Sequence, residues 1–380
     1  MQKPLMLEYC NSFSLVVLMR TIVNSLSLDF QLASVAANLP VTPSCRVKCI
    51  RQGTSSCRTC TPNSNSLLEI DVMLSTCCSS MHSCAIYMST GVAAIAAQVA
   101  ACAARFPRVA VVDTFTDAAY ARSSVKLVGK SGPLLCAAQA AAVLALSSID
   151  LSQQPHPAPH PRCGAVDMVS FMPLSDRKTT ELQGSMKECD ELAWELGRSL
   201  GAAGCPVLMY VFLLLHCSIF NDSPRYGARS SRTILETRRC TTFFSSTDAA
   251  APRHVASSER PDFGPNDIPP NFGVAIVGSQ AYVTNFNIQI ASASLDDCKQ
   301  VASKLRADLK IQCMALHHGC NMIEIGCNLQ ATDVMGCPST DLVLNSVRRL
   351  LPATAIVSRA YIVGLTPSEA LQAADSGIHS

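Results

Sequence analysis

The chain has 380 residues, a formal net charge of +2 and 48% hydrophobic residues. This length and apolar fraction allow a large core divided between two domains or subdomains. The near-neutral charge, without a long basic run, gives no support to nucleic-acid binding.

The 20 cysteines do not indicate an extracellular disulfide scaffold, because such scaffolds are short and this chain is long and apolar. Many of them lie inside apolar runs, where a thiol behaves as a small hydrophobic group, and this favours a reducing compartment. Cys57-x-x-Cys60 and Cys45-x-x-x-Cys49 have ligand-like spacing, but no nearby Cys or His pair completes a recognisable zinc site, so no structural zinc is predicted.

No membrane span is expected either. The most apolar stretch, residues 205–220, is shorter than the roughly 20 residues that a helical span requires. Residues 1–80 are rich in Ser and poor in acids, and we interpret them as a poorly structured extension: a transit peptide or an artefact of the gene model. The expected location is the cytoplasm, with an organelle reached through this extension as the alternative.

From about residue 84 the pattern alternates between helices and strands. In the first half it predicts helices at 91–105, 133–148, 185–201 and 232–240, and strands at 108–113, 124–129, 165–174 and 206–210. Pro133 is expected at the first position of its helix, where a missing N–H costs nothing.

A proline-rich connector at 259–271 separates this half from a second one with the same alternation. The second half predicts strands at 274–279, 282–291, 311–318, 322–331 and 355–364, and helices at 294–308, 339–350 and from Pro367 onward. The fold class is therefore α/β (α+β), with two ferredoxin-like subdomains at 84–260 and 261–376, each a mixed sheet with helices.

The segment His156-Pro-Ala-Pro-His160-Pro-Arg162 carries two imidazoles in a stretch that its prolines keep out of a helix. A histidine in a loop is most often a solvated side chain. Metal binding by the pair requires a sharp turn, because four extended residues separate the rings by roughly 12 Å. General acid/base catalysis is the third interpretation, since imidazole titrates near neutral pH and the prolines order the loop.

The residues from His160 to Leu174 resemble the catalytic segment of the formiminotransferase family. His160-Pro-Arg162-x-Gly164-Ala-Val-Asp167 matches its His-Pro-Arg-x-Gly-x-x-Asp motif, in which the His is the catalytic acid/base. The order of further matches follows the plant-type members: Asp117-Ala-Ala-Tyr-Ala-Arg122, where those proteins have Asp-Ala-Ala-Tyr-Gly-Arg, then Pro261-Asp-Phe-Gly-Pro265, Asn285-Phe-Asn-Ile288, Ile323-Glu-Ile325 and Gly364-Leu-Thr-Pro367.

The resemblance implies transfer of a formimino group, or a formyl group, between N-formimino-L-glutamate and N5 of tetrahydrofolate. It implies two subdomains that face each other across a folate cleft, tetrahydrofolate as co-substrate, no metal, and a homodimer. His160 is the implied catalytic residue. The implied binding residues for folate and the glutamate derivative are His156, Arg162, Gly164, Arg122, Asp117, Tyr226, Gly227, Arg238 and Asn287.

Some positions depart from the family pattern. Animal members have an acidic residue near Phe115 that orients the catalytic His, and Asp113 or Asp117 is the candidate substitute here. Residues 211–225 interrupt a family motif, and we interpret them as an insertion in a region that the family uses for folate. The lost carboxylate near the catalytic His motivates one alternative, a folate-binding homologue with weak or no catalysis. A separate alternative is a metal-dependent hydrolase that uses His156, His160 and His317 or His318.

Overall fold

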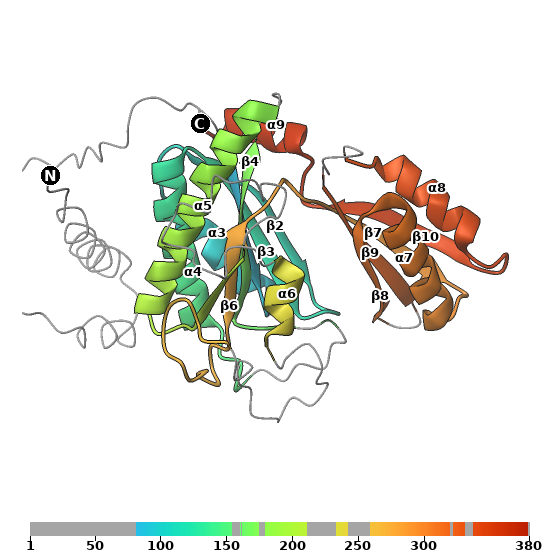
Figure 1. Ribbon diagram of the computed structural model, residues 1–380, viewed down its shortest axis with the longest axis horizontal. Helices are drawn as coiled ribbons and strands as arrows, with labels where there is room; N and C mark the ends of the chain where they lie inside the picture. The colour runs from blue at the N-terminus through green and yellow to red at the C-terminus, as the bar shows by residue number, and fades with distance from the viewer. Residues whose placement is uncertain are drawn as a thin grey trace, which may run out of the picture. The chain divides into compact units, whose positions relative to one another are not determined.

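The computed structural model describes residues 81–153, 160, 162–174, 179–210, 233–241, 259–319, 322–330 and 337–378. The extension at 1–80 and the insertion at 211–225 lie outside these ranges, so both interpretations stay predictions. Two sheets with helices make up the described part of the chain (Figure 1).

The first sheet has six strands in the order β2-β3-β1-β4-β6-β5. The elements that form this half are β1 (Met81–Met88), α3 (Ala93–Ala103), β2 (Val109–Asp117), β3 (Arg122–Gly129), α4 (Ser131–Ser148), β4 (Val166–Leu174), α5 (Thr179–Ala202), β5 (Val207–Tyr210), α6 (Ile234–Arg239) and β6 (Ala275–Ser279). The sheet is mixed, because β6 runs parallel to β4 and β5 while the other pairs are antiparallel.

The second sheet has four strands in the order β10-β7-β9-β8. Its elements are β7 (Thr284–Ala291), α7 (Leu295–Leu309), β8 (Gln312–His318), β9 (Met322–Leu329), α8 (Thr340–Leu350) and β10 (Ile356–Val363). The C-terminal helix α9 (Pro367–Ile378) follows and packs against β2 and β3 of the first sheet. Its strand order matches that of β1 to β4, which confirms the βαββαβ pattern for both halves. The prediction that each half has a mixed sheet is wrong for this second sheet, because all of its neighbouring strands are antiparallel.

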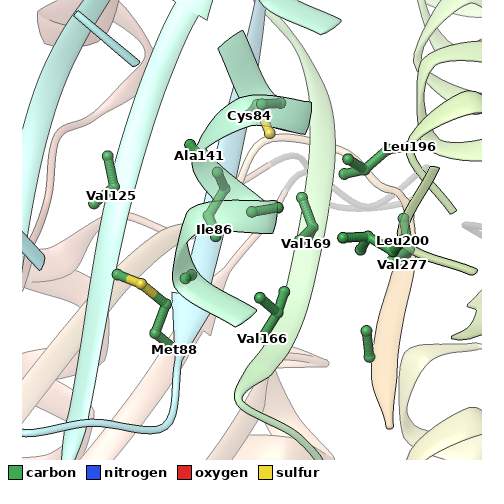
Figure 2. Packing of buried hydrophobic residues seen from close by; sticks show 14 of the residues in the cluster. Cys84, Ile86, Met88, Val125, Ala141, Val166, Val169, Leu196, Leu200 and Val277 are labelled. Atoms are coloured by element: carbon green, nitrogen blue, oxygen red, sulfur yellow. The ribbon is translucent and has the colours of Figure 1, made fainter. Parts of the chain in front are cut away.

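The main core lies between the first sheet and helices α3, α4 and α5, which cover one of its faces (Figure 1). Alternation along β1 directs Cys84, Ile86 and Met88 into this core (Figure 2), while Ala85 belongs to a separate cluster with Ala370 and Ala374 of α9. The sequence pattern does not predict β1, although this strand lies between β3 and β4 in the sheet.

Helix α4 is long and apolar enough to cross a membrane by length and composition alone, but a buried core helix passes the same test. Seven of its side chains are buried, so its apolar character has a structural explanation. The helix begins at Ser131, so Pro133 is its third residue. The prediction that Pro133 is the first residue of the helix is wrong. Proline is tolerated there because the N–H groups of the first turn have no partner within the helix.

The division between the halves also differs from the predicted boundary at 260/261. Strand β6 comes after that point and pairs with β4 and β5, so the first sheet continues to Ser279. The connector lies along the same sheet, where the Val207 N–H donates to the Phe263 carbonyl at 2.9 Å. Parallel pairing of β6, which local sequence patterns do not encode, sets where the first half ends.

Candidate functional site

A tight hairpin between β2 and β3 brings three site residues together. The Asp117 carboxylate accepts the Tyr120 N–H at 2.9 Å, which closes the turn and leads the chain into Arg122. Ala121 adopts a left-handed conformation with φ 50°, at the position where the plant-type motif has glycine. The local sequence therefore forms a turn that projects polar groups from the ends of two strands.

Arg122 is the centre of a hydrogen-bonded cluster. Its Nη1 donates to Ser89 Oγ at 2.8 Å and lies 3.2 Å from Asp167 Oδ2. Its Nε donates to Nδ1 of His160 at 3.3 Å. Arg238 approaches the same carboxylate oxygen from α6, at 3.1 Å. Residues from four separate segments thus meet around one buried carboxylate.

Asp167 remains ionised in this cluster. Burial alone would raise its pKa, but the guanidinium groups of Arg122 and Arg238 outweigh burial and hold the pKa well below its usual range. The carboxylate also accepts backbone N–H groups from Cys163 and Gly164. Burial lowers the pKa of Arg122, while Asp167 raises that of Arg238 against the effect of burial.

The bond from Arg122 fixes the tautomer of His160. A guanidinium can only donate, so Nδ1 of the ring accepts and the proton of the neutral imidazole lies on Nε2. The Tyr120 ring packs 5.4 Å from the His160 ring, and Asp167 is close enough for a charge interaction with it. His160 is therefore oriented by a cation and an aromatic ring.

A second imidazole lies behind the Asp117 turn. His318 of β8 contacts Asp117 Oδ2 through Nε2 at 2.9 Å, and its ring packs against Tyr120 at 4.8 Å. Because a carboxylate only accepts, Nε2 of His318 carries the proton. Asp117, a candidate for orienting His160, thus bonds a histidine of the other half, while Asp113 is half-buried near the charge of Lys126.

Glu324 of β9 lies close to Asp117 and His318, and its side chain is buried. It accepts from Asn287 at 2.9 Å, from Gln289 at 3.3 Å and from the Tyr361 hydroxyl at 2.7 Å. The potential metal-ligand atoms of Asp117, His318 and Glu324 lie within 4.8 Å of one another. Since protein donors already bond both carboxylates, hydrogen bonding accounts for this group without a metal.

These clusters border a pocket of about 570 Å³, which is within the usual size of a small-molecule site. Both sheets and α6 contribute to its wall. The charged residues along it are the cations Arg122, Arg238, Arg306 and Lys310 and the carboxylates Asp117, Asp167 and Glu324. An anionic ligand with an aromatic or apolar body fits such a lining.

Five of the predicted site residues line this pocket: Asp117, Arg122, His160, Arg238 and Asn287. The role found for Asn287 is to donate to Glu324. His156, Tyr226 and Gly227 lie outside the described residues, so their predicted roles stay predictions.

Gly164 and Arg162 are buried and are not part of the described lining. A Cβ on Gly164 would lie 2.4 Å from the Val274 carbonyl oxygen, because the chain forms a bridge between Gly164 and Gly273. The close approach that this glycine permits is to the protein's own backbone, whereas the sequence interpretation assigned it to a ligand.

Sequence reasoning gave no role to Asp167, Ser89, Tyr120 or Glu324, and it considered His318 only as a metal ligand. Asp167 and Tyr120 stand inside the quoted motifs, so their spacing from His160 and Arg122 was a usable signal. Glu324 also stands inside a quoted motif, Ile323-Glu-Ile325, but its bonding partners are distant in the sequence, as are those of Ser89.

Comparison with known proteins agrees with this architecture. Residues 81–280 match the family model described as the formiminotransferase domain, N-terminal subdomain. The formiminotransferase cyclodeaminase-like protein of Arabidopsis thaliana is 26% identical over 282 residues, which is 70% of this chain and 86% of that protein. A glutamate formimidoyltransferase of Thermoplasma acidophilum is 28% identical over 277 residues, covering 69% of this chain and 80% of the relative.

The formimidoyltransferase-cyclodeaminase of Sus scrofa is 27% identical over 211 residues, and the match covers 55% of this chain but 33% of that longer protein. The family model covers more than half of the chain and includes the whole cluster around Asp167. On these grounds the chain belongs to the formiminotransferase family.

Proposed function

We propose that this protein is a folate-dependent transferase that moves a formimino or formyl group between N-formimino-L-glutamate and N5 of tetrahydrofolate. Membership in the family supports formimidoyltransferase activity in general, without specifying the donor. The observation that carries the finer proposal is the contact of Arg122 with both His160 and Asp167 at the wall of a pocket of suitable size.

The reaction needs a group that takes a proton from N5 and returns one to the departing glutamate nitrogen. His160 suits this task because imidazole accepts and donates near neutral pH. With Arg122 donating to Nδ1, however, the ring holds its proton on Nε2 and cannot accept there.

The anionic substrate resolves this conflict. The bond between Arg122 and His160 is 3.3 Å long, at the weak end of the range for hydrogen bonds. A ligand carboxylate that attracts the Arg122 guanidinium would release Nδ1, and Nε2 could then alternate between acceptor and donor. Substrate binding and activation of the base are thereby coupled through one arginine, and Asp167 keeps that arginine at the pocket.

The same bond favours a second candidate, a folate-binding homologue with little catalysis. If Arg122 stays on Nδ1 when the ligand is bound, His160 remains in its donor tautomer and the proton relay is blocked. The location of the protein and the formation of a homodimer remain parts of the proposal taken from the resemblance alone.

The test compares the wild-type chain with His160→Gln, and uses His317→Gln as a control because His317 is an exposed histidine of β8 outside the pocket lining. Mass spectrometry follows the N5-substituted tetrahydrofolate formed from formiminoglutamate or a formyl donor, and titration measures the affinity for folinic acid. Loss of general acid/base catalysis predicts that His160→Gln lowers kcat by about 10²- to 10⁴-fold with affinity unchanged within about threefold.

Wild-type folate binding without turnover of either donor would support the binding homologue. Absence of binding in the wild type and in a variant lacking residues 211–225 would contradict both candidates.

A further inference from the structure

Two cysteines face each other across neighbouring strands of the second sheet. Cys313 of β8 is directly opposite Cys327 of β9 in the antiparallel register. Residues opposite each other in such a ladder have their Cα atoms about 4.5–5.5 Å apart and project to the same face. A disulfide requires a Cα separation of about 4.4–6.8 Å, so this pair can be bridged without moving the backbone.

The two side chains lie on the core-facing side of their strands. Cys327 is buried in the hydrophobic cluster under α7, Cys313 packs against that cluster, and Cys313 Sγ donates to the Ala302 carbonyl at 3.1 Å. Both are free thiols in this structure. Their side chains therefore share one face of the sheet at a fixed register.

The pair is chemically asymmetric. Interaction with the neighbouring Cys327 thiol lowers the pKa of Cys313 against the effect of burial, and Arg306 of α7 lowers it further. The same interaction, together with burial, raises the pKa of Cys327. Cys313 is also the more exposed of the two, on the edge strand of the sheet. These features make Cys313 the nucleophile and Cys327 the resolving thiol.

We propose that Cys313 and Cys327 form an oxidisable pair that closes to an intramolecular disulfide by exchange with a small-molecule disulfide of the glutathione class. The Cys313 thiolate attacks one sulfur of glutathione disulfide, forms a mixed disulfide and expels one glutathione thiolate. Cys327, after losing its proton, attacks the Cys313 sulfur and expels the second glutathione. Two protein thiols are oxidised and one glutathione disulfide is reduced to two thiols.

The bond would fix one wall of the pocket. Side chains alternate along each strand, so the pairs on either side of the cysteines face the other way: Gln312 with Asn328, and Met314 with Gly326. All four of these residues line the pocket. Cys313 and Cys327 are also among the lining residues. Oxidation would therefore pin edge strand β8 to β9 within the wall of the ligand site, and this inference does not depend on what the ligand is.

The experiment incubates the full-length chain with mixtures of reduced and oxidised glutathione, blocks free thiols, and maps the linked peptides. Trypsin releases residues 311–348 as one peptide that also contains Cys320 and Cys337, so a second cleavage after Glu324 is needed to separate Cys313 from Cys327. A Cys320→Ser/Cys337→Ser variant serves as the background in which no other thiol of this peptide competes.

The expected result is a peptide pair joined through Cys313 and Cys327, with both sites lost to alkylation, in the wild type and in the background variant. Adding Cys313→Ser to that background should abolish the link. A stable mixed disulfide on Cys313 with Cys327 still open to alkylation, or pairing of Cys313 with Cys320 or Cys337, would overturn the proposal.

Discussion

Asp167→Asn removes one negative charge from the most heavily bonded carboxylate of the site. The side chain is 4% exposed and receives Arg122 at 3.2 Å and Arg238 at 3.1 Å. Asparagine has nearly the same shape, so packing is preserved while two buried guanidinium groups lose the charge that they share. The perturbation is therefore electrostatic.

The size of the effect follows from the burial of the partners. Breaking a buried ion pair by removing one member costs about 3–5 kcal/mol, because an uncompensated charge stays inside. That is a large fraction of the roughly 5–15 kcal/mol by which domains are stable. At about 2–4 °C per kcal/mol for a domain of this size, Tm should fall by roughly 6–20 °C.

Denaturant unfolding of the wild type, Asp167→Asn and Arg238→Gln measures the effect. Arg238→Gln should be the milder change, because it leaves Arg122 paired with Asp167. Asp296→Asn is the matched control, since its ion pair with Lys299 is exposed and contributes at most about 1 kcal/mol. A loss of less than about 1 kcal/mol in Asp167→Asn, or a larger loss in Arg238→Gln, would refute the reasoning.

Three further changes test other parts of the structure. Burial lowers the pKa of His82 in the folded state below the 6.5 of the unfolded chain, despite its bond to a carboxylate. Between these two pKa values only the unfolded state binds a proton, so the free energy of unfolding should fall as the pH drops below about 6.5, by up to about 1.4 kcal/mol per pH unit. Unfolding of His82→Gln measured against pH should show a flatter slope than that of the wild type. Ala121→Gly should raise the free energy of unfolding by about 1 kcal/mol because it relieves a left-handed φ of 50°, whereas Ala119→Gly, in the same turn without a positive φ, should not. His318→Gln removes the contact of 2.9 Å that holds the pocket carboxylate Asp117. The affinity for folinic acid, measured by titration, should therefore weaken about 5- to 30-fold, while His317→Gln should leave it unchanged. Equal affinities of the two variants would contradict a role for this contact.

The sequence by itself determined the repeated βαββαβ alternation and the family. Both follow from local information: the period of apolar residues distinguishes strands from helices, and the spacing within His160-Pro-Arg-x-Gly-x-x-Asp167 is a property of one short segment. Asp117, Arg122, His160, Arg238 and Asn287, which the resemblance assigned to one site, all line one pocket, and their roles in binding and catalysis stay predictions.

Tertiary structure alone decided which groups bond to which. Strand β6 joins the first sheet through parallel pairing with β4, and this moved the division between the halves past the connector. Asp117 meets His318 across 201 residues of chain, and Glu324 collects donors from two other strands. No local pattern encodes such contacts, because they depend on the order of the strands and the register between them. The sequence therefore specified the chemical groups of the site, while the fold decided that Arg122 bonds Nδ1 of His160.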